Sequence, residues 1–71
     1  MIEIRVEVFN EQGQWMDVLF GEVPVLPYIG GKMNLPGRGN VVVKDVVHCF
    51  DSETKPDMIF NYVEIVVEQV Q

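Results

Sequence analysis

A ten-residue, valine-rich segment in the middle of the chain, Val41–Phe50, limits the fold more than any other feature of the sequence. Seven of its residues are apolar, and five of these are valine. Valine is stiff at χ1 and fits the pleated surface of a sheet better than it fits a helix. The polar pair Lys44 and Asp45 interrupts the run, so we expect one long strand that bends at a β-bulge there and serves two parts of a sheet.

The composition extends this preference to the whole chain. The 71 residues include 14 valines, 5 isoleucines and no alanine, so helix propensity is low throughout. A chain of this length has room for one small core, and we assign residues 1–71 to a single small β-barrel domain. The expected fold class is all-β, a five-stranded antiparallel meander that is strongly bent or closed into a barrel.

Alternation of apolar and polar residues predicts the other strands. Residues 1–9 alternate cleanly, as in a half-buried strand. Lys32–Leu35 alternates as a short third strand, and Met58–Val70 alternates as the fifth. Between the second and third strands, Gly21–Gly31 contains proline and glycine but is too apolar for a solvated linker. We expect this segment to be an arch that plugs one end of the sheet.

The turns imply a register for the first hairpin. Asn10–Gly13 predicts a three-residue loop with its glycine in the left-handed conformation, and Leu35–Gly37 predicts a type II turn. The hairpin then pairs apolar residues of the two strands on the core face: Val8 with Met16, Val6 with Val18, and Ile4 with Phe20. It leaves Phe9, Trp15 and Leu19 together on the opposite face.

Phe9, Trp15 and Leu19 are the candidate partner-binding residues. Large apolar groups on the solvent side of a sheet need cover, and aromatic residues are enriched where interfaces concentrate binding energy. Either the arch Val23–Ile29 folds over this face, or it plugs the barrel end and leaves Phe9 and Trp15 free. The leading hypothesis is a non-enzymatic protein-binding or structural module that uses this outward aromatic face.

The sequence contains no arrangement that indicates catalysis, a metal site or a cofactor. His48 and Cys49 are adjacent on a strand and should point to opposite faces, which argues against a shared metal ion and against a histidine-activated thiol. The acidic loop Asp51–Asp57 lacks the glycine and the final bidentate glutamate of an EF-hand. Gly30–Lys32 lacks the spaced glycines of a phosphate-binding loop. We therefore predict no enzyme activity and no cofactor.

The charge of the chain separates further classes of partner. Five basic and 11 acidic residues give a net charge of −6, which argues against nucleic acid as the partner. The aromatic residues that could stack on bases are Phe9, Trp15, Tyr28 and Tyr62. A basic groove would require Lys32, Arg38 and Lys44 to cluster. The acidity instead supports an alternative function, an acidic viral or mobile-element inhibitor that binds a basic target surface.

Self-association is the second alternative. We expect the fifth strand to have an open edge, with Val66 pointing outward, so that a copy of the chain could pair with it in a homodimeric assembly. The apolar runs are too short for a membrane helix. The lone Cys49, and a start at Met1 that leads directly into a strand, point to a reducing compartment. That compartment is the cytoplasm, or the host cytoplasm if the gene is viral.

Turn chemistry in the middle of the chain is shared with a known group of folds. The residues concerned are Val23-Pro24, Gly31-Lys32 with Leu35-Pro36, and Val41–Val43 with Val46–His48. This half of the chain resembles small SH3-like and related β-barrels of bacteria and phages, and the resemblance implies a barrel of SH3-like size. The regular first hairpin departs from SH3 domains, which have a long irregular loop there. The resemblance implies no functional residue.

Overall fold

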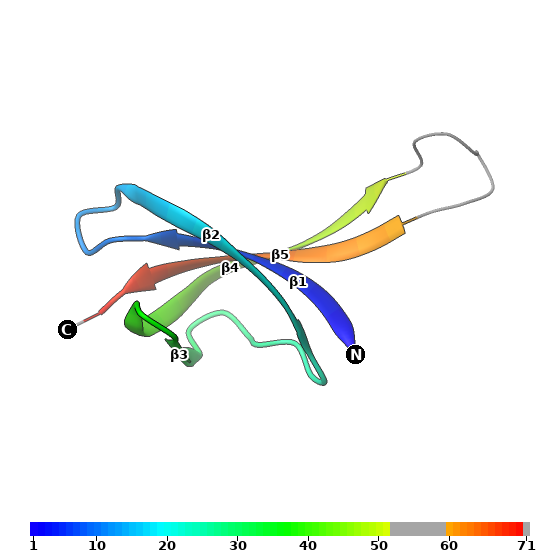
Figure 1. Cartoon of the computed structure of the whole chain (residues 1–71), viewed down its shortest axis with the longest axis horizontal. Helices are drawn as coiled ribbons and strands as arrows, with labels where there is room; N and C mark the ends of the chain where they lie inside the picture. Colours follow the sequence, from blue (N-terminus) through cyan, green and yellow to red (C-terminus); the bar gives the residue numbers. More distant parts are fainter. Residues whose placement is uncertain (52–59, 71) are drawn as a thin grey trace.

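The computed structural model describes residues 1–51 and 60–70, which form a single twisted sheet (Figure 1). The strands are β1 (Ile2–Phe9), β2 (Trp15–Val23), β3 (Lys32–Leu35), β4 (Gly39–Asp51) and β5 (Phe60–Gln69). No helix occurs in the described residues, and so none could cross a lipid bilayer. The expected all-β class and the five strands are confirmed.

The strand order is β2-β1-β5-β4-β3, which is not the predicted meander. β5 lies between β1 and β4, parallel to the first and antiparallel to the second. The reason lies in the burial of β5, whose Val63, Ile65 and Val67 are at most 4% exposed and need apolar strands on both sides. The four-residue β3 takes an edge instead, which suits a short strand. The predicted open edge on the fifth strand is therefore wrong.

The core lies on one face of the sheet, which we call the inner face. Its buried residues come from every strand except β2: Ile4, Val6, Val8, Leu35, Val41, Val43, Val63, Ile65 and Val67. Leu19 and Val23 of β2 pack against this cluster from the side, as does Leu26 of the arch. The sheet curls around this core as a half-barrel, as the long bent strand had indicated.

The predicted bulge in β4 is confirmed. The pairing of β4 with β5 shifts between Val43 and Asp45, so Lys44 is the extra residue. Val43 lies opposite Val67 on the inner face, whereas Asp45 lies opposite Val66 on the other face. The bulge thus keeps a carboxylate out of the core.

The register of the first hairpin differs from the prediction by one residue. Phe9 lies opposite Trp15 as expected. The pairing of β1 with β2 then shifts by one residue, because Met16 is bulged and has no partner on β1. The pairs beyond the shift are Val8 with Asp17, Glu7 with Val18, Val6 with Leu19, Arg5 with Phe20, and Ile4 with Gly21. Because one slipped residue turns every later side chain over, Leu19 packs on the core while Phe20 is 77% exposed. The expectation that Leu19 shares a face with Phe9 and Trp15 is therefore wrong.

The predicted turns hold the strands in this arrangement. Gly13 has φ +79°, and the Asn10 side-chain oxygen accepts hydrogen bonds from the backbone N–H of Gln12 at 3.0 Å and of Gln14 at 2.9 Å. Gly37 has φ +73°, and the Arg38 N–H donates to the carbonyl of Leu35 at 3.0 Å. The positive φ and this hydrogen bond agree with the predicted type II turn.

The half-barrel stays open between its two edge strands, β2 and β3. An ion pair bridges the opening: the Arg38 guanidinium, from the turn after β3, contacts the Asp17 carboxylate on β2. The hydrogen bond to Asp17 raises the pKa of Arg38 above its usual value, so the guanidinium stays charged. Gln69 anchors the same turn, because its side-chain amide donates to the Arg38 carbonyl at 3.0 Å.

The arch between β2 and β3 covers part of the inner face. Leu26 packs against the core, and Gly30 and Gly31 exchange 2.8 Å backbone hydrogen bonds with Val43 of β4. Val25 and Tyr28 remain 77% and 75% exposed. Of the two positions expected for the arch, the structure shows the one that leaves Phe9 and Trp15 uncovered by it.

Candidate functional site on the outer face

Four aromatic side chains lie on the face of the sheet opposite the core. Phe9 belongs to β1, Trp15 and Phe20 to β2, and Tyr62 to β5. Strand alternation places Phe9 and Tyr62 there, since they follow and precede the buried Val8 and Val63, and pairing places Trp15 opposite Phe9 and Phe20 opposite the outward Arg5. We call this set, Phe9, Trp15, Phe20 and Tyr62, the outer aromatic face.

Two of the four side chains of the outer aromatic face are mostly exposed to solvent. Phe20 is 77% exposed and Trp15 is 59% exposed, while Phe9 and Tyr62 are half-buried. Trp15 lies directly opposite Phe9 across the β1–β2 pair, so the two are cross-strand neighbours on this face. Phe20 stands apart from them, further along β2.

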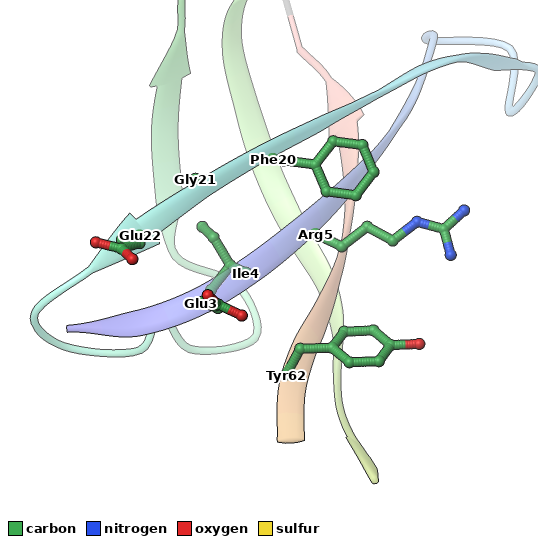
Figure 2. Close-up of a pocket in the computed structure, with 7 residues that line it drawn as sticks. All are labelled: Glu3, Ile4, Arg5, Phe20, Gly21, Glu22 and Tyr62. Atoms are coloured by element: carbon green, nitrogen blue, oxygen red, sulfur yellow. The ribbon is translucent and has the colours of Figure 1, made fainter. Parts of the chain in front are cut away.

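Phe20 forms one wall of a hollow across β2, β1 and β5. The hollow measures about 610 Å³, and its lining includes Arg5 and Tyr62. Figure 2 shows Phe20, Arg5 and Tyr62 projecting to the same side, with the guanidinium of Arg5 between the two rings. Arg5 lies 3.6 Å from Glu7 through its Nη2, and its buried Nε has no hydrogen-bond partner among residues 1–51 and 60–70.

The rim of this hollow is acidic. Glu3 on β1 lies directly opposite Glu22 on β2, and both line the hollow. Like charges directly across a strand pair are unfavourable. In the described part of the chain, neither glutamate has a cation within ion-pair distance, since the ion pairs there are Arg5–Glu7 and Arg38–Asp17.

Cys49 and Glu64 are neighbours of Tyr62 on the outer face. The Cys49 thiol lies opposite Tyr62 on β4, 4.0 Å from a carboxylate oxygen of Glu64. Hydrogen bonding to Cys49, and then the charge of its thiolate, raise the pKa of the Tyr62 hydroxyl. Tyr62 therefore keeps its proton at neutral pH, and its side chain lines the hollow.

The adjacent His48 and Cys49 lie on opposite faces, as strand alternation requires. His48 is paired with Val63 of the inner face and Cys49 with Tyr62 of the outer face. Residues 1–51 and 60–70 contain no group of three metal-ligating side chains. The acidic loop Asp51–Asp57 lies, apart from its first residue, outside the described residues. Arg38, one member of the suggested basic cluster, is occupied by Asp17.

The structure brings Phe9 and Trp15 together as predicted and moves Leu19 to the core. Phe20 and Arg5 were not predicted as site residues, and Tyr62 was named only as an aromatic residue that could stack on bases. The sequence carries one signal for them: if a bulge is allowed in the second strand, Phe20 joins Arg5 on the outer face. The expectation that Phe9 and Trp15 bind a partner stays a prediction.

Comparison with known proteins adds no relative to this picture. No family model, curated protein or solved structure matches the chain. The role of the outer face is therefore inferred from its residues. They offer exposed aromatic area and one guanidinium, which are groups enriched at protein interfaces, together with several carboxylates.

Proposed function

We propose that this protein is a binding module for another protein and that the outer aromatic face is its binding surface. One observation carries the proposal: Phe20 and Trp15 are 77% and 59% exposed on the same face of one sheet. Tryptophan, tyrosine and arginine dominate the binding energy of interfaces, and Trp15, Tyr62 and Arg5 all lie on this face. Apolar side chains gathered on one open face mark such sites more often than single scattered ones do.

The chemistry of the face specifies the partner. An apolar side chain of the partner packs against the exposed ring of Phe20, in a hollow lined mainly by carbon. A lysine or arginine of the partner lies against Glu3 and Glu22, and its charge relieves their mutual repulsion. A backbone carbonyl or carboxylate of the partner can accept from the exposed part of the Arg5 guanidinium, since the side chain is 39% exposed.

The acidic rim also favours the second candidate function, occupation of a basic surface on a target protein. The observation in its favour is the Glu3–Glu22 pair together with the net charge of −6. The two functions differ in what carries affinity. An apolar interface keeps most of its affinity at high ionic strength, whereas a charge-driven one loses it steeply.

A matched set of variants tests the proposal. The tagged wild-type protein, Trp15→Ala/Phe20→Ala and Tyr28→Ala are used to capture partners from native lysate. Tyr28 is the control because it is an aromatic residue of the arch that is 75% exposed, close to the 77% of Phe20. Any protein retained by wild type is then purified, and its affinity for all three is measured at low and high salt.

The expected result is one protein held by wild type and Tyr28→Ala and bound about tenfold or more weakly by the double variant. Circular dichroism must show that the wild-type protein and both variants are folded. Equal binding by the double variant and by Tyr28→Ala would refute the outer aromatic face as the site. Loss of binding at high salt with no effect of the double variant would support the charge-driven function instead.

A further inference from the structure

β2 is an open edge whose protection lies at its start, where Met16 is bulged and Asp17 points to the inner face and binds Arg38. The whole strand, Trp15–Val23, pairs with β1 on one side and, in the described residues, with nothing on the other. Its span contains no lysine and no proline, the residues that natural edge strands use to prevent pairing. It also carries three of the exposed large apolar residues, Trp15, Met16 and Phe20.

The opposite edge of the sheet is protected by contrast. β3 covers β4 from Gly39 to Val42, and the arch glycines hydrogen-bond to Val43. Where β4 continues uncovered, it starts with a bulge at the exposed Lys44. A bulge and a lysine both disfavour strand addition. The two edges of the same sheet therefore differ, and β2 is the one able to accept a strand.

We propose that two copies of this chain pair antiparallel through β2, about a two-fold axis at Leu19. Val18 of each copy then lies opposite the partner's Phe20 on the outer face. Leu19 lies opposite the partner's Leu19 on the inner face, and Asp17 lies opposite the partner's Gly21. A β2–β2 pair formed in this way joins two five-stranded sheets into one and brings the two outer aromatic faces side by side.

Neighbouring registers are less favourable. A two-fold axis at Phe20 would set Val18 against the partner's Glu22. An axis at Val18 would set Leu19 against the partner's Asp17. The register at Leu19 places Asp17 against a glycine, where a side chain would meet nothing within 4 Å in the single copy. Over Asp17–Gly21, it is the register that pairs apolar with apolar side chains and leaves the carboxylate room.

The salt dependence of this dimer should differ from that of binding to a basic partner. Each copy carries a net charge of −6, so two copies repel each other at low ionic strength. Added salt screens the repulsion and strengthens the dimer. The basic partner inferred above would respond in the opposite sense. A failure of self-pairing is therefore distinguishable from a failure of the proposed function, which a single copy can perform.

The experiment measures molar mass by light scattering over a wide range of protein and salt concentration. The single variants are Val18→Lys and Phe20→Glu, and the third is the double variant Val18→Lys/Phe20→Glu. Within one copy, position 18 faces Glu7 and position 20 faces Arg5, so both new charges have an intrachain counterpart and the fold is kept. Tyr28→Glu has the same charge change as Phe20→Glu at a site of similar exposure.

The wild-type protein should dimerise as concentration rises, and more readily with salt. Each single variant should weaken the dimer by about tenfold or more, while Tyr28→Glu should leave it intact. The double variant should restore the dimer, because each lysine at position 18 meets the partner's glutamate at position 20. A wild-type protein that stays monomeric at every concentration and salt would refute the proposal. Equal effects of Phe20→Glu and Tyr28→Glu, or no rescue in the double variant, would refute this register.

Discussion

Asp17 shows how a residue that conflicts with the local pattern is tolerated by a distant one. It lies on the inner face opposite Val8, a position that sequence alternation would reserve for an apolar side chain. Arg38, 21 residues away, meets its carboxylate across the open side of the half-barrel. The one-residue shift at Met16 turns Asp17 to the inner face, and this ion pair makes that position acceptable.

Asp17 and Arg38 should be energetically coupled, because their ion pair links the two edges of the sheet. Asp17→Asn and Arg38→Gln should each lower the melting temperature, and the double variant should lose less than the sum of the two, because either change alone breaks the contact. Thermal unfolding followed by circular dichroism measures the three losses. Strictly additive losses would show that the two side chains do not interact.

Tyr62 should titrate above the ordinary pKa of tyrosine because Cys49 lies against it. In a Tyr28→Phe background, where Tyr62 is the remaining tyrosine, Cys49→Ala should lower this pKa toward the ordinary value of about 10. Absorbance of the phenolate against pH measures the change. Because the folded protein holds the Tyr62 proton more tightly than the unfolded chain, the free energy of unfolding should fall as pH rises above about 10. An unchanged pKa in Cys49→Ala would remove Cys49 as the cause.

At the scale of elements, the two bulges explain what the sequence could and could not predict. The bulge at Lys44 was predictable because the charged residues Lys44 and Asp45 interrupt an otherwise apolar strand, and Asp45 would fall on its apolar face. The bulge at Met16 was not, because Asp17 makes the odd positions of β2 look like the outward ones, although the other residues from Trp15 to Phe20 are apolar. An inward Asp17 is acceptable only through its contact with the distant Arg38.

The Met16 bulge makes a specific prediction about a deletion. Without Met16, Trp15 still lies opposite Phe9 and Asp17 still lies opposite Val8, so every later pair is preserved. The deletion should therefore cost no more than about 1 kcal/mol in the free energy of unfolding, a typical value for a single change. Urea unfolding measures this.

A deletion in a regular strand provides the control. Glu7 lies in β1, which pairs in register with β2 on one side and β5 on the other. Removing it turns part of β1 over, and cooperative unfolding should be lost. If deletion of Met16 is as damaging as deletion of Glu7, β2 is paired without a bulge.

At the scale of the whole molecule, the order of the strands followed from burial that no local pattern encodes. The sequence predicts the all-β class, the third strand and the turns, since these depend on neighbouring residues. It could not place β5 between β1 and β4, because a parallel neighbour can come from either end of the chain. The same limit applied to the site: Phe20, Arg5 and Tyr62 meet through three strands, and their meeting depends on the register and the strand order together.

In the observed register, Phe20 faces solvent, whereas its neighbour Leu19 packs against the core. The most direct measurement is the free energy of unfolding of Leu19→Ala and Phe20→Ala by urea, at protein concentrations low enough to keep the chain monomeric. Leu19→Ala should lose about 2 kcal/mol, the lower end of the range for a buried leucine, since Leu19 is partly buried against the core. Phe20→Ala should stay within about 0.5 kcal/mol of wild type, as expected for an exposed residue. The reverse order, with Phe20→Ala the more destabilised variant, would place Phe20 in the core and contradict both the register and the binding face built on it.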